Sequence, residues 1–213
     1  GMDAALAIDL YSVGGKGLWE HGNNILLRTI SDEEFARKRG LNDKELRRTI
    51  DTINSKLLAA RAKRERPGLD DKALTSWNAM MVQGYCDAYE VFSEPAHLAQ
   101  AKRTMELLLT KCRRPDGGLW HSYKAGKATI NGYLEDYSFT TEALLALYAI
   151  TFEERWLTEA KALTDHAIAH FHTEGEAVFH FTSDQDPPLI ARKSEVTDNV
   201  IPASNSSMAK ALF

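Results

Sequence analysis

The sequence lacks the marks of several protein classes. Among its 213 residues there are only two cysteines, Cys86 and Cys112, which are not spaced as a CxxC pair and which fall within helical apolar patterns. No run of about 18 apolar residues is present to span a bilayer. The N-terminus also lacks the charged start and long apolar stretch of a signal peptide. We therefore expect a cytoplasmic protein with buried, reduced thiols and no membrane partner.

Strong charge of either sign is also missing, since the formal net charge is only −4. Basic residues gather at 61–66 but form no stripe long enough to follow a phosphate backbone, which argues against a nucleic-acid partner. No pair of histidines or cysteines has ligand spacing on a shared helix face, so we expect no metal and no cofactor. With 44% hydrophobic and 26% charged residues, the composition is typical of a globular protein with a substantial core.

What the sequence does contain is a succession of helical patterns. A short helix is expected over residues 3–12, and capping signals at Ser31 and Asn42 predict a short helix and then a longer one that ends before Pro67. Apolar residues at helical spacing then predict four long helices and the start of a fifth, at about 69–92, 95–111, 133–151, 153–171 and from 203. Short strands are expected at 25–27, 116–123 and 177–182.

The helical part repeats with a period of about 59 residues. Shifting the chain by this period aligns more identical residues than chance would, namely Tyr89 with Tyr148, Glu94 with Glu153, Leu98 with Leu157, Ala101 with Ala160, Lys102 with Lys161, and His121 with His180. The repeat units cover approximately 70–129 and 130–200, each a helix pair followed by a hairpin. We therefore predict one all-α domain over 2–213, a partial toroid of helix pairs with short β-hairpins on one rim.

Polar clusters recur at the starts of alternate helices. They comprise Asp70, Asp71, Thr75, Ser76, Trp77 and Asn78, then Glu135, Asp136 and Tyr137, then Asp198, Ser204, Asn205 and Ser206. If alternate helices form the inner ring, these clusters meet at the mouth of one funnel. Paired carboxylates beside aromatic rings suit sugar chemistry, with Asp71 and Asp136 as the acid–base pair and Trp77 and Tyr137 as platforms. The alternative is that these residues only cap helices.

Two further groups carry both a functional and a structural interpretation. His121 and His180 occupy matching positions in the two hairpins, as a proton-transferring pair or as structural histidines on strand faces. Trp19 belongs to a polar and aromatic cluster after three glycines, which predicts binding or simple turn formation with equal weight.

Three motifs resemble the spermatogenesis-associated protein 20 family. They are Arg61-Ala-Lys-Arg-Glu-Arg-Pro-Gly-Leu-Asp-Asp-Lys-Ala-Leu-Thr-Ser-Trp-Asn78, Gly132-Tyr-Leu-Glu-Asp-Tyr-Ser-Phe139 and Pro202-Ala-Ser-Asn-Ser206. The resemblance runs over nearly the whole chain and implies a six-hairpin, (α/α)6-type barrel, similar to those of glycoside hydrolases and of N-acylglucosamine 2-epimerase. It concerns the helical part of the family, without the thioredoxin-like domain. About half of the helices of a closed ring are expected in this chain.

Three functions remain open at this point. The first is a carbohydrate-active or carbohydrate-binding domain with a sugar ligand, glycoside hydrolase-like if active. The second is a non-catalytic helical module, in which a homodimer or another partner covers the open ends of the toroid, because such ends predict a large exposed apolar patch. The third is a sugar 2-epimerase-like isomerase that uses histidines.

Overall fold

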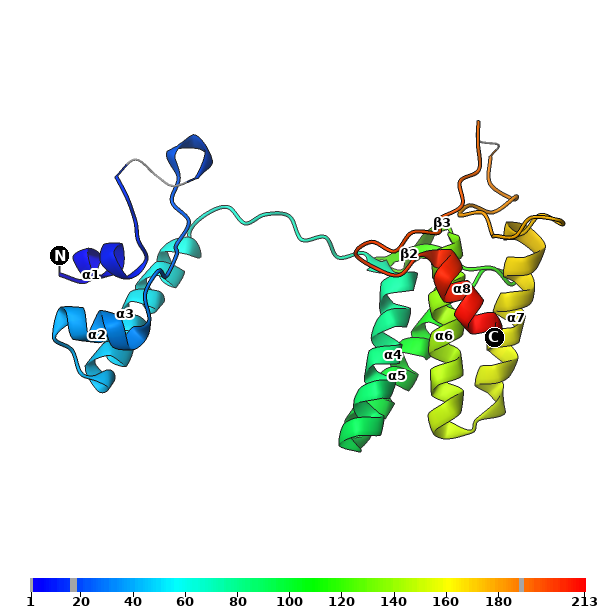
Figure 1. Cartoon of the computed structure of the whole chain (residues 1–213), viewed down its shortest axis with the longest axis horizontal. Helices are drawn as coiled ribbons and strands as arrows, with labels where there is room; N and C mark the ends of the chain where they lie inside the picture. The colour runs from blue at the N-terminus through cyan, green and yellow to red at the C-terminus, as the bar shows by residue number, and fades with distance from the viewer. Residues whose placement is uncertain (1, 16–18, 188–189) are drawn as a thin grey trace. The chain divides into compact units, whose positions relative to one another are not determined.

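The computed structural model of the protein describes residues 2–15, 19–187 and 190–213. Its contacts fall into two compact units, an N-terminal unit of residues 1–69 and a C-terminal unit of residues 70–213 (Figure 1). Within the described residues, no helix is long and apolar enough to cross a membrane. A single domain over 2–213 stays a prediction.

The N-terminal unit packs three helices around a small core. They are α1 (Met2–Leu10), α2 (Asp32–Arg39) and α3 (Asp43–Arg61), with a single turn of 3-10 helix, η1 (Glu20–Gly22), between α1 and α2. The Ser31 hydroxyl accepts the Glu34 N–H at the start of α2. Asn42 and Glu45 complete a reciprocal capping box at the start of α3, which confirms the predicted helix starts. The core consists of Leu10, Phe35, Ala36, Leu46 and Ile53.

The strand predicted at residues 25–27 is wrong. These residues are described as irregular backbone, and their side chains are about half exposed. The Leu27 N–H donates to the Tyr11 carbonyl oxygen, in the turn after α1. A run of three apolar residues predicts a strand only if a second strand lies beside it, and here the neighbour is a turn.

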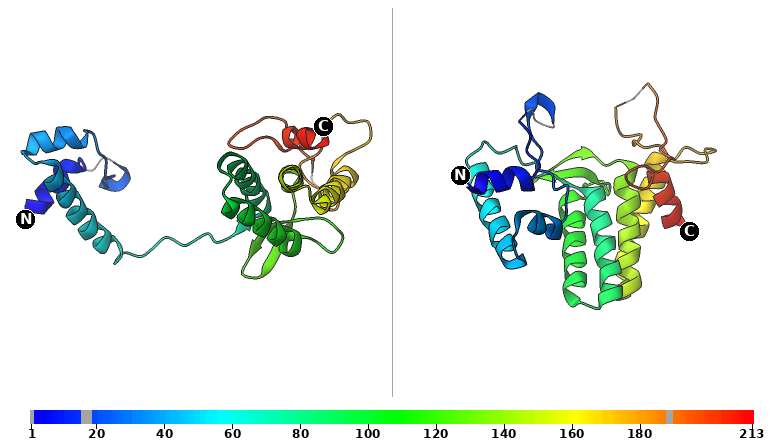
Figure 2. Two further views of the ribbon diagram at one scale, coloured as in Figure 1. Left: turned by 90° about the horizontal axis from the view of Figure 1, so that it is seen from below. Right: turned by 60° about the vertical axis from the view of Figure 1, so that its left-hand side comes forward.

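The C-terminal unit consists mainly of long helices that run side by side (Figures 1 and 2). Its elements are β1 (Ala73–Leu74), α4 (Thr75–Phe92), α5 (Pro95–Leu107) with its π-helical continuation η2 (Leu108–Cys112), β2 (Trp120–Lys124), β3 (Lys127–Asn131), α6 (Leu134–Thr151), α7 (Glu154–Phe171) and α8 (Ser204–Leu212). The helix pairs α4–α5 and α6–α7 confirm the mostly helical fold class, while the bounds of the two repeat units stay a prediction.

Helix α6 lies at the centre of this unit. It packs against α4, α7 and α8, and its first eleven residues are buried with few exceptions. The core combines large side chains such as Met105, Leu147, Trp156 and Phe171, all of them fully buried. A helix that is buried nearly all round must carry its polar side chains inside the protein, where each needs a partner. The polar start of α6 is therefore the place to look for a site.

A small antiparallel sheet lies near the starts of α4 and α6. Its order is β1-β2-β3, with Ala73 opposite Tyr123 and Trp120 opposite Asn131. The two-residue turn between β2 and β3 has positive φ at both Ala125 and Gly126, as tight hairpins require. This hairpin confirms the strand predicted within 116–123.

The strand predicted at residues 177–182 is also wrong. The described backbone there is irregular, because its hydrogen bonds go to three separate segments instead of one partner strand. The His180 N–H donates to Phe171, the Phe181 N–H donates to Lys193, and the Phe181 carbonyl accepts the Leu134 N–H. The two repeat units therefore share helices but differ at this rim.

Candidate functional site

The central residue of the candidate site is Asp136, in the first turn of α6. Its side chain is 0% exposed. Oδ1 accepts the backbone N–H of Ser76 at 2.9 Å, and Oδ2 accepts the backbone N–H of Tyr133 at 2.9 Å. One carboxylate thus binds the first turns of two neighbouring helices, α4 and α6, where unpaired N–H groups and the helix dipole favour a negative charge.

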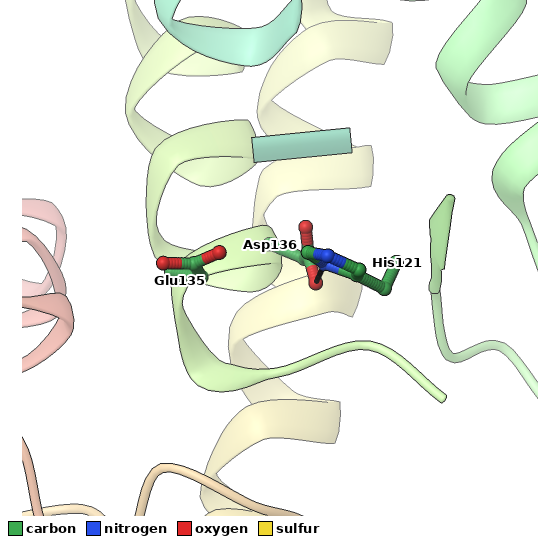
Figure 3. A group of neighbouring side chains, drawn as sticks. All are labelled: His121, Glu135 and Asp136. Atoms are coloured by element: carbon green, nitrogen blue, oxygen red, sulfur yellow. Dashed lines mark hydrogen bonds and ion pairs between the residues drawn. The ribbon is translucent and has the colours of Figure 1, made fainter. Parts of the chain in front are cut away.

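His121 completes this arrangement from strand β2. Its Nδ1 lies 2.9 Å from Oδ2 of Asp136, and Figure 3 shows the ring and the carboxylate facing one another. The ring also packs against that of Tyr133, with centroids 4.9 Å apart. The hydrogen bond to Asp136 raises the pKa of His121, and partial burial opposes this rise. Asp136 therefore orients the imidazole and stabilises its protonated form.

The pKa of Asp136 itself reflects a balance. Burial is the largest effect and raises it above its ordinary value, although the hydrogen bonds from His121 and from the Tyr133 and Ser76 N–H groups oppose this rise. Its described partners, Ser76, Tyr133 and His121, all belong to the protein, an arrangement that suits a positioning residue.

Glu135 is the more accessible carboxylate of the pair. It is half-buried, and the Ser76 hydroxyl donates to its Oε1 at 3.2 Å. In Figure 3 it lies to one side of the Asp136–His121 contact. Burial is the largest cause that raises the pKa of Glu135, followed by the negative charge of Asp136, and Glu195 adds to the rise. A raised pKa favours the protonated form of a carboxyl group, which is the direction that a general acid requires.

A cavity of about 310 Å³ lies between α4, α6 and α8. We call it the inner cavity. On α6 its lining includes Phe139 and Glu142, which are four and seven residues after Glu135 and so lie on the same helix face. Glu142 is fixed from α8 by the Ser207 hydroxyl and by the Lys210 ammonium group. The remaining lining residues are Met80, Gln83, Pro202, Ser206, Ser207 and Lys210.

The three side chains of the cluster also have the chemistry of metal ligands. One ligand atom each from His121, Glu135 and Asp136 lies within 4.8 Å of the others. The sequence predicted no metal because no ligand pair shares a helix face, and the cluster escapes that test because His121 comes from a strand. Both oxygens of Asp136 already accept hydrogen bonds, so the donor set fits internal positioning better than coordination.

Of the residues predicted around the start of α4, Ser76 bonds Asp136 and Glu135, while the others have different partners. Asp71 is half exposed and pairs with Lys124 at 2.5 Å, and Asp70 pairs with Lys72 at 3.4 Å. The Thr75 hydroxyl donates to the Trp120 carbonyl oxygen. The remaining two are Asn78, whose amide donates to the Leu74 carbonyl, and Trp77, which is 57% exposed. The contacts of Asp71 and those of Asp136 involve different partners, so the structure provides no support for that pair.

Tyr137 does not fit the role of a sugar platform. Its ring is fully buried, stacked on His166 with centroids 5.3 Å apart, and its hydroxyl oxygen accepts the Leu119 N–H. Position 137 follows Asp136 on the helix and so turns into the core, away from the face of Glu135. Residues that are adjacent at a helix start do not share a helix face.

The residues predicted before α8 hold that helix in place. Asp198 accepts the Ala203 N–H and the Ser206 hydroxyl, and Glu195 accepts the Ser204 N–H. Asn205 bonds both backbone groups of Phe179. For these residues the capping alternative of the sequence analysis agrees with the contacts.

Trp19 belongs to the N-terminal unit, where it is 60% exposed and its backbone N–H donates to the Asn23 carbonyl. His180 bonds Thr173 and lies 3.1 Å from Glu176, so it is not paired with His121. Sequence reasoning missed the contact between His121 and Asp136 and the involvement of Glu195. The signal available was that Asp136 is three residues after Tyr133, at a position where a carboxylate caps a helix.

Solved structures show which folds the chain resembles. A glycoside hydrolase of family 105 from C. acetobutylicum ATCC 824 aligns with a TM-score of 0.54 and 10% identity over 85% of this chain and 53% of its own. A D-mannose isomerase aligns with a TM-score of 0.54 and 14% identity over 66% of this chain and 38% of its own. A cellobiose 2-epimerase from Spirochaeta thermophila DSM 6192 aligns with a TM-score of 0.51 and 16% identity over 57% of this chain and 33% of its own. The fold is mostly helical and resembles that of (α/α)6 toroids.

Curated relatives then give the family resemblance. The chain is 31% identical to human spermatogenesis-associated protein 20 over 206 residues, which is 90% of this chain and 26% of that protein. It is 28% identical over 191 residues to an uncharacterised protein of Caenorhabditis elegans, at 86% and 26% coverage. The chain thus spans about a quarter of the length of these relatives. The resemblance to the spermatogenesis-associated protein 20 family is confirmed, and no family model matches the chain.

Proposed function

We propose that this chain forms part of a carbohydrate-active protein, in which a sugar occupies the inner cavity and exchanges protons with Glu135 and His121. The observation that carries this proposal is the cluster of His121, Glu135 and Asp136 at the start of α6, one helical turn from a cavity that Phe139 helps to line. A cavity of about 310 Å³ has the size of a small-ligand site. Phe139 contributes an apolar part of the lining, and Glu142, which is already bonded by Ser207 and Lys210, contributes a carboxylate.

The roles of the three residues follow from their surroundings. Glu135 is the candidate general acid, because burial and the neighbouring carboxylate raise its pKa. His121 is the candidate base, oriented through Nδ1 so that Nε2 remains for proton transfer. Asp136 is a positioning residue. This assignment replaces the predicted pair of Asp71 and Asp136, since Asp71 does not line the inner cavity.

The test is a calorimetric titration of the chain with a panel of mono- and oligosaccharides, followed by a product assay for any sugar that binds. We expect Glu135→Gln to lower turnover by at least about a hundredfold, the usual contribution of a general acid. Glu90→Gln serves as the matched control, because Glu90 is an exposed carboxylate on α4. Absence of binding by every sugar, or equal turnover in the two variants, would contradict the proposal.

A specific observation favours isomerisation or epimerisation as the second candidate. The polar clusters predicted at the helix starts contain no histidine, but β2 brings His121 to the start of α6. An imidazole with a pKa above its ordinary value is suited to remove a proton from a carbon next to a carbonyl group. In D2O this reaction incorporates deuterium into the sugar, whereas hydrolysis alone does not. Deuterium incorporation that persists in His121→Asn would refute this candidate.

The interaction module stays an alternative prediction. It predicts that no sugar binds and that light scattering detects a dimer or a complex. The titration above therefore separates it from the carbohydrate-active proposal.

A further inference from the structure

A second cavity, of about 460 Å³, lies between the start of α4, helix α5 and the turn that joins β2 to β3. We call it the hairpin cavity. It shares no lining residue with the inner cavity. Its lining consists of Asp71, Ala73, Asn78, Gln100, Arg103, Thr104, Leu107, Tyr123, Lys124 and Ala125. Nothing in the proposed sugar chemistry uses it.

The charges of the hairpin cavity are unbalanced. Two cationic side chains, Arg103 and Lys124, line it together with a single carboxylate, Asp71. Lys124 is paired with Asp71 at 2.5 Å. Arg103 bonds the amide oxygen of Gln100, and among the described residues no carboxylate forms an ion pair with it. An arginine that lines a concave surface without a carboxylate partner offers its planar donors to a carboxylate or phosphate group.

The neutral lining suits a hydroxylated ring next to that anion. Tyr123 supplies an aromatic ring, and Asn78, Gln100 and Thr104 supply amide and hydroxyl groups. The Asn78 amide nitrogen donates to Leu74, which leaves its amide oxygen to accept a hydroxyl group. The volume is within the range of small-molecule sites.

We propose that the hairpin cavity binds a small ligand with a phosphate or carboxylate group on a hydroxylated ring. Arg103 and Lys124 bind the anionic group, and Asp71 is the internal counter-ion that the ligand displaces from Lys124. Asp71 therefore competes with the ligand for Lys124, and removing its charge strengthens binding. Removing the charge of a catalytic acid would instead lower activity. The inference does not rest on the function proposed for the inner cavity.

Calorimetric titrations with glucose 6-phosphate, glucuronate and glucose test it at low and at physiological salt. We expect at least one of the two anions to bind about tenfold more tightly than glucose, and the tighter one identifies the anionic group. Added salt weakens that binding. Glucose binding equal to that of both anions would overturn the proposal.

Three variants sharpen the test. Arg103→Gln is expected to weaken anion binding about tenfold, and Asp71→Asn to tighten it several-fold, since the lining then has no competing carboxylate. Lys127→Gln is the matched control, an exposed lysine at the start of β3 that does not line the cavity. Weaker binding by Asp71→Asn, or equal losses in Arg103→Gln and Lys127→Gln, would overturn the assignment. Circular dichroism checks that each variant is folded, and Glu135→Gln is expected to leave anion binding unchanged.

Discussion

His121 and His180 occupy corresponding positions of the two repeat units, yet their surroundings differ. His121 lies on strand β2 and bonds the fully buried Asp136. His180 lies on irregular backbone and contacts Thr173 and the half-exposed Glu176. The difference comes from the rim, where the first unit forms a hairpin across the start of α6 and the second forms a loop. The two repeat units therefore have corresponding helices, but the contacts of His121 and His180 differ.

The largest effect is expected when the buried carboxylate of Asp136 is removed. Asp136→Ala leaves the Ser76 and Tyr133 N–H groups and His121 without their acceptor. We expect the free energy of unfolding to fall by about 3 kcal/mol or more, the cost of several unpaired buried donors. Asp198→Ala removes a more exposed cap of α8 and is expected to cost about 1 kcal/mol. Urea unfolding measures both, and equal losses would contradict the central position of Asp136.

A glycine next to the hairpin offers the next test. A Cβ atom at Gly132 would lie 2.8 Å from the Leu119 carbonyl oxygen and 3.1 Å from the Tyr137 ring. Backbone cannot move aside easily, so we expect Gly132→Ala to cost about 1–3 kcal/mol of unfolding free energy. Gly84, in the middle of α4, has open space where a Cβ atom would lie and is the control. Its replacement by alanine is expected to be neutral or stabilising, and the reverse order of the two effects would show that the hairpin packs loosely.

The pKa of His121 tests whether Asp136 sets the surroundings of this histidine. Its value lies above 6.5 mainly because of the hydrogen bond to Asp136. Asp136→Asn should lower it, since the largest cause of the rise is removed and only the smaller effect of the Glu135 charge still opposes burial. In the native protein this ion pair stabilises the fold below pH 6.5, and the contribution is lost as the pH rises through the folded pKa. NMR titration of the His121 ring measures the shift, and an unchanged pKa in the variant would remove Asp136 as its cause.

The smallest effect is expected at His180. Its partners Thr173 and Glu176 belong to the same loop segment, and partly exposed ion pairs contribute little to stability. His180→Ala should therefore change the unfolding free energy by less than about 1 kcal/mol and leave sugar turnover unchanged. A loss of turnover equal to that of His121→Ala would restore the predicted histidine pair.

Local signals in the sequence were enough to predict most of the fold. Ser31, Asn42 and Glu45 cap the helices that they predict, because a cap involves residues three positions apart. The strands at 25–27 and 177–182 could not be judged in the same way, since a strand depends on a partner that local pattern does not reveal. The prediction of strand β2 was correct because its partner β3 follows directly after the turn at Ala125-Gly126, within the same stretch of chain.

The candidate site was predicted less well for a related reason. The sequence identified Glu135 and Asp136 correctly as members of a polar helix start, but it paired Asp136 with Asp71 instead of His121. The contact between Asp136 and Ser76 joins residues 60 positions apart, and only the packing of α4 on α6 creates it. Tyr137 was assigned to the same face as its neighbours, although consecutive helix residues point in different directions.

The most direct test of the central claim is chemical-shift mapping of the chain by NMR with a sugar that binds. The account predicts that the largest shifts occur at Glu135, Phe139 and Glu142, around the inner cavity, together with His121. Largest shifts at residues outside both this cavity and the His121 cluster, with no change at Glu135, would contradict a carbohydrate site at the start of α6.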